Sequence, residues 1–313
     1  MVDFSIIIPH KNIPKLLQRC LDSIPKREDL EIIIVDDNSD ESIVDFNHFP
    51  GSDRQDAILV FDKTGKGAGH ARNLGIEHAR GQWIIFADAD DYFNYCIRDI
   101  LVEYQQEEAD VVYFAASSVD SETYNNDNRA DCFNYFLNEY FLTHEEKNLR
   151  YVVACPWAKL IKKSLLVNNN IVFPETVKYE DVEFSYLVGH CARKIKGDRR
   201  ALYCLTSRQE SLSNKITRES ILDNMRVMAG KDAFLEKHHV ILSECHLHNY
   251  RRTLIDVAKS GDKELYAQCL DILAQFGISK QQVAKDVEEA LCTRNRKMSW
   301  FGLLKQKIAN RTF

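Results

Sequence analysis

Residues 84–93, IIFADADDYF, place three aspartates directly behind an apolar run. The run itself is typical of a buried β-strand, because it is short, apolar and bounded by polar residues. Asp88, Asp90 and Asp91 follow it closely. Like charges this close repel each other, and carboxylates lose favourable hydration when they are buried. Such a group indicates either a ligand site or a solvated acidic turn that begins the next helix.

The composition is that of a globular protein, and 313 residues are enough for about two domains. A net charge of -6 provides no broad basic field, which argues against nucleic-acid binding. Nine scattered cysteines without a C-x-x-C pair argue against a disulfide framework or zinc ribbon and favour a reducing compartment. The chain shows no signal-peptide pattern and no run near the roughly 20 apolar residues of a spanning helix, so we expect a cytoplasmic protein.

Apolar runs recur at regular intervals in the first hundred residues. Apolar runs begin at Ile6, Ile32, Ile58 and Ile84, with helix-like stretches between them. This alternation predicts βαβ units around a buried parallel sheet, an α/β fold. Asn12 is expected to cap the first helix. A further strand is expected at 109–115, ADVVYFA.

Polar side chains follow two of these strands at once. Asp36 and Asp37 come after the second strand, and the aspartates from Asp88 onward come after the fourth. Ligands of open parallel sheets bind beyond the carboxyl ends of the strands. A divalent cation would remove the repulsion between the carboxylates, and oxygen ligands suit Mg²⁺ or Mn²⁺.

Three phosphate-handling motifs fit poorly. A P-loop requires Ser or Thr where Gly67 stands, and a dinucleotide fingerprint requires Gly where Arg72 stands. Asp88 and Asp90 match the aspartate pair of haloacid dehalogenase-type phosphatases, but Tyr92 occupies the position of a hydroxyl or branched residue, and that motif usually lies on the first strand.

The blocks SIIIPHKN, EIIIVDDNSDES and GKGAGHARNLGIEHARGQWIIFADADDYF, in this order, resemble glycosyltransferase family two. A later block, CPWAKLIKKSLLVNNNIVFPETVKYEDVEFSYLVG, resembles the acceptor half of bacterial members that build surface polysaccharides. The resemblance covers about residues 4–213 and implies a GT-A fold, a Rossmann-like, mainly parallel sheet flanked by helices. It divides a catalytic domain, 1–215, into a nucleotide-sugar-binding half, 1–110, and an acceptor-binding half, 111–215.

The resemblance assigns the nucleotide site. Pro9 lies where the family has a nucleotide-contacting loop, and Asp36 and Asp37 match an acidic pair that accepts from the base, such as uracil N3–H. Lys11 stands where the family usually has an aromatic residue that stacks on the base, and a lysine cannot stack in the same way.

The resemblance also assigns the diphosphate and metal site. Asp88 and Asp90 match its D-x-D motif, so both are expected to hold Mn²⁺ or Mg²⁺, with Asp90 the direct ligand and Asp88 facing the ribose or the metal. Arg72 matches the start of its A-R-N helix and either meets the donor or braces the aspartates. Arg208 either contacts phosphate or belongs to an ordinary surface loop.

The implied activity is an inverting transfer of a sugar from a nucleoside-diphosphate donor, with UDP expected, to a hydroxyl of a glycan or lipid-linked acceptor. Asp181 matches the base of the family's E-D motif, and Glu180 supports it or binds the acceptor. The alternative for both is a helix N-terminus that favours acidic residues. Trp157 and Lys159 are candidates for the acceptor pocket, although Trp is also a common core residue.

Two other functions remain open from the sequence. A catalytically inactive relative would bind nucleotide sugar only as a partner in an assembly, but all three carboxylates expected to do the chemistry are present. A nucleotidyltransferase would carry a glycine-rich loop after the first strand, and PHKN is not one.

Residues 216–313 do not match the family pattern, and their amphipathic sequence predicts a helical C-terminal region. Its end, 293–313, is basic and places Trp300 and Phe301 near helical spacing with other apolar residues. Such a helix lies peripherally on an anionic membrane or packs its aromatic face on the protein. The first alternative implies contact with the inner face of the cell membrane.

Overall fold

The computed structural model describes residues 2–176, 178–208, 216–243, 250–279, 281–283 and 285. The chain divides into two compact units. The first unit consists of Met1–Thr176 and Glu180–Lys215, and the second of Val177–Tyr179 and Ile216–Phe313.

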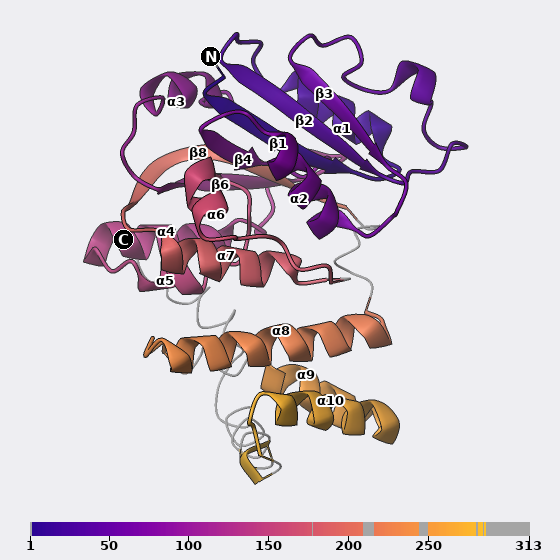
Figure 1. Ribbon diagram of the computed structural model, residues 1–313, viewed down its shortest axis with the longest axis vertical. Coiled ribbons are helices and arrows are strands. Elements are labelled where there is room, and N and C mark those ends of the chain that lie inside the picture. Colours follow the sequence, from indigo (N-terminus) through magenta and orange to yellow (C-terminus); the bar gives the residue numbers. More distant parts are fainter. Residues whose placement is uncertain are drawn as a thin grey trace. The chain divides into compact units, whose positions relative to one another are not determined.

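A mixed, mostly parallel sheet forms the centre of the first unit (Figure 1). Its strand order is β3-β2-β1-β4-β7-β6-β8-β5. The strands are β1 Phe4–His10, β2 Leu30–Asp37, β3 Ala57–Asp62, β4 Trp83–Phe86, β5 Tyr92–Phe93, β6 Val111–Asp120, β7 Lys159–Lys162 and β8 Ile195–Ser207.

The four expected apolar runs form the parallel part of the sheet. Strand β1 pairs in parallel with β2 on one side and β4 on the other, and β2 pairs in parallel with β3. Nearly all residues of β1, β2 and β4 are buried, as expected for strands covered on both faces. This register brings the carboxyl ends of β2, β1 and β4 together at one edge, which confirms the predicted fold class.

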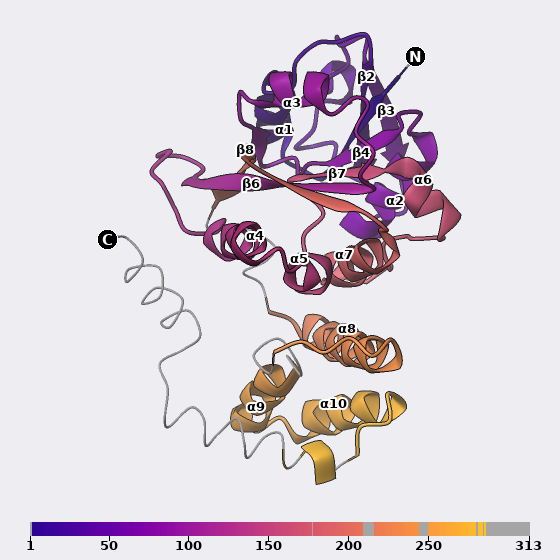
Figure 2. The same cartoon turned by 90° about the vertical axis from the view of Figure 1, so that its left-hand side faces the viewer.

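Helices cover both faces of this sheet. In Figure 2, α1 and α3 lie on one face and α4, α5 and α7 on the other. The helices of the first unit are α1 Pro14–Asp22, α2 Ala68–His78, α3 Ile97–Glu103, α4 Asp131–Thr143, α5 Lys147–Tyr151, α6 Lys163–Asn168 and α7 Glu180–Cys191. The close approach of α2 to β1 needs a glycine, because a Cβ on Gly75 would overlap the side chain of Ile7.

Some details differ from the prediction, which also named no strand at β7 or β8. Asn12 does not cap α1: it has a φ of 58°, and its side-chain oxygen instead accepts from the Asp40 amide. The short strand β5, directly behind the aspartates, was not predicted, and it pairs antiparallel with β8. This pairing brings the end of β8 to the aspartates, although they are more than a hundred residues apart in the sequence.

The second unit is helical. Helices α8 Arg218–Lys237, α9 Tyr250–Ser260 and α10 Lys263–Gln275 share an apolar core that includes Met225, Leu254 and Cys269. Thr217 and Ser220 form a capping box at the start of α8, and Asp262 caps α10. Within the described residues, no helix is long and apolar enough to cross a membrane. The segment 293–313 lies outside the described residues.

Candidate functional site

The three aspartates behind β4, here called the β4 cluster (Asp88, Asp90 and Asp91), are held in place by the end of β8. The Asp88 amide donates to the hydroxyl of Tyr203 over 2.7 Å. The Thr206 amide donates to Asp91 over 2.7 Å, and the Thr206 hydroxyl donates to the Asp90 carbonyl over 2.6 Å. Asp91 is buried and orders the loop, whereas the other two carboxylates remain partly exposed.

Arg72 joins the β4 cluster to the start of α7. Its guanidinium donates to Asp88 over 2.7 Å and to Glu180 over 2.9 Å. It is 5% exposed, so both hydrogen bonds lie in a largely water-free place. A single buried cation therefore brings together the two acidic motifs that the sequence places almost a hundred residues apart, and Arg72 braces the aspartates.

The β4 cluster is crowded with negative charge. Burial, and then the charge of Asp88, raise the pKa of Asp90, although Arg208 donates to this carboxylate over 3.0 Å. Burial raises the pKa of Asp91 well above its usual range, and the charges of Asp88 and Asp90 add to this effect. Among the described residues, the donors to Asp90 and Asp91 do not outweigh burial and mutual repulsion.

Asp181 lies next to Glu180 in the first turn of α7, and its pKa is shifted toward neutral pH. Burial raises its pKa to about 7, the charges of Glu180 and Asp88 act in the same direction, and the Arg72 guanidinium opposes them. A carboxylate that titrates near neutral pH is suited to proton transfer.

The aspartates at the end of β2, here called the β2 pair (Asp36 and Asp37), have a different environment. Asp36 is 1% exposed. It accepts from the His10 ring over 2.8 Å and from the hydroxyl and amide of Ser39 over 2.5 and 3.0 Å. The Ile13 amide can only donate, and it donates to His10 Nε2, so Nδ1 carries the proton that bonds Asp36. Both carboxylate oxygens of Asp36 therefore accept hydrogen bonds within the protein, and Asp36 orders the loop.

Asp37 lies against the start of α2. It accepts from Lys11 over 2.9 Å and from the Gly67 amide over 3.0 Å. Gly67 caps α2 with a φ of 98°, which side chains rarely adopt. Lys11 is 43% exposed at its side chain, and Pro9 lies two residues before it inside β1. Lys11, in place of an aromatic residue, thus forms an ion pair with Asp37.

The donor set at the β4 cluster fits a hard divalent cation that is shared with a substrate. Asp88 and Asp90 each use one carboxylate oxygen to accept from an arginine, and among the described residues the other oxygen makes no hydrogen bond. In the part of the chain that the structure describes, no three or more His, Cys, Asp or Glu side chains form a complete metal site. Mg²⁺ is commonly held by one or two carboxylates together with substrate phosphates, so two aspartates are sufficient.

Sequence reasoning missed several residues around this site. Arg19, on α1, donates to the Asp90 carbonyl and to the Thr206 hydroxyl, and no motif signals it. Tyr203 and Thr206 lie within a segment that resembles the family, but nothing in their spacing indicates that they hold the aspartates. Lys159 does not line a pocket, because it is 1% exposed, whereas Trp157 keeps part of its ring accessible.

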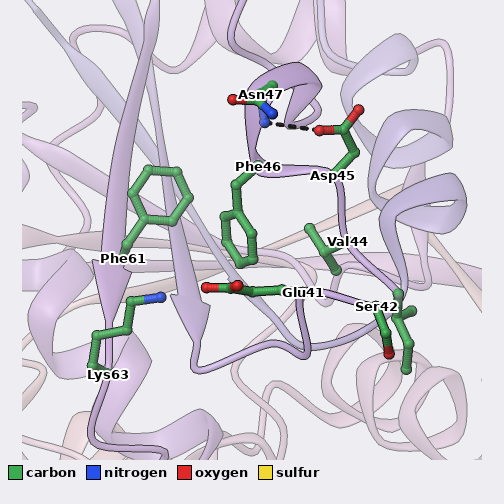
Figure 3. Close-up of a pocket in the computed structure, with 9 residues that line it drawn as sticks. Glu41, Ser42, Val44, Asp45, Phe46, Asn47, Phe61 and Lys63 are labelled. Carbon is green, nitrogen blue, oxygen red and sulfur yellow. Dashed lines mark hydrogen bonds between the residues drawn. The ribbon is translucent and has the colours of Figure 1, made fainter.

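An open hollow of about 680 Å³ is lined by the loop that follows β2, residues 41–47, and by Phe61 and Lys63 (Figure 3). Phe46, on the short 3₁₀ helix η1 Phe46–His48, packs edge-on against Phe61 of β3. The ammonium of Lys63 lies 5.0 Å from the centre of the Phe46 ring. None of the predicted site residues lines this hollow.

Comparison with known proteins gives relatives that are glycosyltransferases. Over 223 residues the chain is 30% identical to the glycosyltransferase EpsJ of Bacillus subtilis, covering 67% of this chain and 62% of EpsJ. It is 25% identical over 250 residues to TarS of Staphylococcus aureus, a poly(ribitol-phosphate) β-N-acetylglucosaminyltransferase, covering 76% of this chain and 42% of TarS. The chain thus spans less than two thirds of either relative.

Solved structures share the fold. TarS in complex with UDP-GlcNAc has a TM-score of 0.63 at 22% identity, covering 88% of this chain and 80% of that one. The mannosyltransferase PcManGT from Pyrobaculum calidifontis, in complex with GDP-Man and Mn²⁺, has a TM-score of 0.56 at 17% identity, covering 92% and 86%. These likenesses confirm a GT-A-like fold. The family model for glycosyl transferase family 2 matches residues 5–168, more than half of the chain, and the protein belongs to this family.

Proposed function

We propose that this protein is an inverting glycosyltransferase that moves a sugar from a UDP donor to a hydroxyl of a glycan or lipid-linked acceptor. One observation carries the proposal: Arg72 joins Asp88 of the β4 cluster to Glu180, directly beside Asp181. The arrangement places carboxylates suited to a cation next to a carboxylate suited to take a proton. Family membership and the fold are consistent with it.

Asp88 and Asp90 are the residues proposed to hold Mn²⁺ or Mg²⁺, with the diphosphate of the donor completing the site. When bound, the cation acts as a Lewis acid that neutralises the charge growing on the leaving diphosphate. Arg208 is partly exposed beside Asp90 and is proposed to contact the same phosphates. PcManGT, with the same fold, binds Mn²⁺ together with GDP-Man.

Asp181 is proposed as the base that takes the proton of the acceptor hydroxyl. Its raised pKa, about 7, allows it to be ionised before the reaction and still accept a proton during it. Glu180, held by Arg72, is proposed to fix this part of α7 in place. Attack of the hydroxyl on the face opposite the leaving diphosphate inverts the configuration, so an α-linked donor gives a β-linked product.

The nucleotide is proposed to bind at Lys11 and Asp37, with Pro9 shaping the loop beneath it. Asp37 has further lone pairs for an N–H such as uracil N3–H, and Lys11 offers a donor to a base carbonyl or a phosphate. UDP is the nucleotide proposed here, because TarS, which has the same fold, binds UDP-GlcNAc. We propose that Asp36 orders this loop through its hydrogen bonds with His10 and Ser39.

The biological setting proposed here is synthesis of a bacterial cell-surface polysaccharide on the cytoplasmic side of the membrane. The named activity of TarS, transfer of N-acetylglucosamine to poly(ribitol phosphate), is an example of surface-polymer modification. We assign catalysis to 1–215 and a supporting role to 216–313. The basic segment 293–313 is proposed to contact anionic lipid, which predicts salt-sensitive vesicle binding that is lost when this segment is removed.

Screening a panel of nucleotide sugars tests the proposal. The protein is incubated with each UDP-, GDP-, CDP- and dTDP-sugar and Mn²⁺, and release of the nucleoside diphosphate is measured with and without EDTA. We expect metal-dependent turnover of at least one UDP-sugar and stronger binding of UDP than of CDP. Tight Mn²⁺-dependent binding of UDP without turnover of any donor, with all acceptors tried, would instead indicate a catalytically inactive relative that acts in an assembly.

A further inference from the structure

Lys159 is an unusual residue for the inside of a protein. It begins β7, directly opposite Tyr113 of β6, and is 1% exposed. Burial lowers the pKa of its ammonium, as expected for a cation removed from water. Lysine is almost never fully buried unless its charge is paired, so a specific interaction must keep it there.

The ammonium of Lys159 closes a turn in its own chain. It donates to the carbonyl of Cys155 over 2.6 Å and lies 5.0 Å from the centre of the Tyr113 ring. Within this turn, Ala158 has a φ of 53°, a left-handed conformation that costs free energy for any residue with a Cβ. The carbonyl of Ala158 accepts from the Phe114 amide over 2.9 Å. The turn is therefore strained, and Lys159 ties its two ends together.

The turn presents Trp157 to the β4 cluster. Trp157 stacks on Tyr203 with ring centres 5.8 Å apart and an angle of 11° between the ring planes, and it also contacts Phe133. The Tyr203 hydroxyl in turn accepts from the Asp88 amide. Contacts therefore run without a break from the turn, through Trp157 and Tyr203, to the backbone of Asp88.

We propose that Lys159 is a positioning residue that closes the turn 155–158 and thereby holds Trp157 as a wall of the acceptor site beside the β4 cluster. This inference rests on the proposed function, because only a sugar transferase has an acceptor site there. A partly accessible indole is a suitable surface for the apolar face of a sugar ring. Lys159 itself does not touch the acceptor and acts through Trp157.

The test uses the full chain and reads the surroundings of Trp157 by fluorescence. The substitution Lys159→Met keeps the length of the side chain and removes its donor and its charge. The contribution of Trp157 is isolated in every background by subtracting the spectrum of the same variant carrying Trp157→Phe. Lys162→Met is the matched control, since Lys162 lies on the same strand and also donates to a carbonyl, that of Glu108, but at the surface.

We expect Lys159→Met to shift the emission of Trp157 to the red and to increase its quenching by acrylamide, while Lys162→Met changes neither. Affinity for UDP in EDTA, measured by calorimetry, should stay unchanged, because Lys11 and Asp37, which are proposed to hold the nucleotide, are not part of the contacts that run from Lys159 to Asp88. A second substitution, Ala158→Gly, relieves the strained φ and should move the Trp157 signal of Lys159→Met back toward that of the wild type.

Wild-type Trp157 emission in a folded Lys159→Met variant would overturn the inference. Loss of cooperative unfolding in both Lys159→Met and the double variant with Ala158→Gly would also overturn it, since Lys159 would then support the core as a whole. Recovery of folding by Ala158→Gly supports it. A wild-type protein that binds no nucleotide with Mn²⁺ contradicts the proposed function itself, and with it the acceptor-wall role, even if Lys159 still governs the Trp157 signal.

Discussion

The β2 pair and the β4 cluster contain the same residue type at the same edge of one sheet. The pKa of Asp36 is nevertheless lowered, whereas those of Asp90 and Asp91 are raised. Burial alone would raise the pKa of Asp36, yet hydrogen bonds from His10 and Ser39 outweigh it and lower that pKa. At the β4 cluster, burial and mutual repulsion prevail and raise the pKa of Asp90 and of Asp91. The number of donors that the fold supplies makes the difference.

This contrast separates two uses of a buried carboxylate. Where the protein provides several donors to the carboxylate, as at Asp36, the ionised group stabilises a loop. Where burial and repulsion outweigh the donors, as at Asp90 despite its hydrogen bond from Arg208, the site favours a cation, and a nearby carboxylate such as Asp181 gains affinity for a proton. Uncompensated charge therefore marks the proposed reaction centre.

The largest expected effect comes from Asp181→Asn. Loss of the proposed base should lower sugar transfer by about 10²–10⁴ while UDP binding changes little, because such groups typically contribute this much to rate. Steady-state transfer and calorimetry with UDP measure the two effects. Glu183→Gln, in the same turn of α7, is the control and should retain activity. Transfer by Asp181→Asn within about tenfold of the wild type would exclude Asp181 as the base.

A smaller but still large effect is expected for Asp90→Asn. Removing a charge from the proposed metal site should weaken Mn²⁺-dependent UDP binding by about tenfold or more, equal to at least about 1.4 kcal/mol. The binding that remains in EDTA should be similar to that of the wild type. Asp99→Asn, at an exposed position of α3, serves as the control. Unchanged Mn²⁺ dependence in Asp90→Asn would show that the cation, if one binds, is held elsewhere.

The pH dependence of turnover should reflect the pKa of Asp181, which is about 7. A base must be ionised to act, so kcat/KM should rise about tenfold from about pH 6 to about pH 8 and then level off. The charge of Arg72 opposes the rise in this pKa, so Arg72→Met should move the profile to higher pH. A flat profile over this range would argue that proton transfer to Asp181 does not limit the reaction.

The sequence predicted the parallel part of the sheet but not β7 and β8, which complete the sheet. Evenly spaced apolar runs predicted β1 to β4 and their parallel order, because strands buried on both faces have a simple signature. The short strand β5 was not predictable, since two residues carry no periodicity. The role of Asn12 was missed because a tertiary contact, its hydrogen bond to the Asp40 amide, replaces the local cap that its residue type favours.

The sequence predicted which residues form the candidate site but not how those residues contact one another. Motif resemblance pointed to Asp88, Asp90 and Asp181, and it offered bracing of the aspartates as one role for Arg72. It did not predict that Asp36 and Asp37 have different environments, because the two residues differ only in the hydrogen-bond donors that tertiary structure brings to them. Arg19 was missed for the same reason, since its contact to the Asp90 carbonyl depends on how α1 packs against β5.

The contrast between the two acidic groups predicts opposite effects on stability. The pKa of Asp36 is lowered, so its ionised form stabilises the fold above the unfolded pKa of about 3.9, and Asp36→Asn should destabilise by about 1–3 kcal/mol at neutral pH. The pKa of Asp181 is raised to about 7, so its ionisation costs stability as the pH rises from about 4 to about 7. Allowing for its partial exposure, Asp181→Asn should stabilise by about 1–2 kcal/mol above that range.

Urea unfolding of the wild type, Asp36→Asn and Asp181→Asn at about pH 8 and about pH 4 therefore tests the central claim most directly. At the higher pH, the unfolding midpoint should fall for Asp36→Asn and rise for Asp181→Asn, and the gain for Asp181→Asn should vanish at the lower pH. A midpoint that falls equally for both variants at the higher pH would contradict the claim that hydrogen-bond donors outweigh burial at Asp36 but not at Asp181.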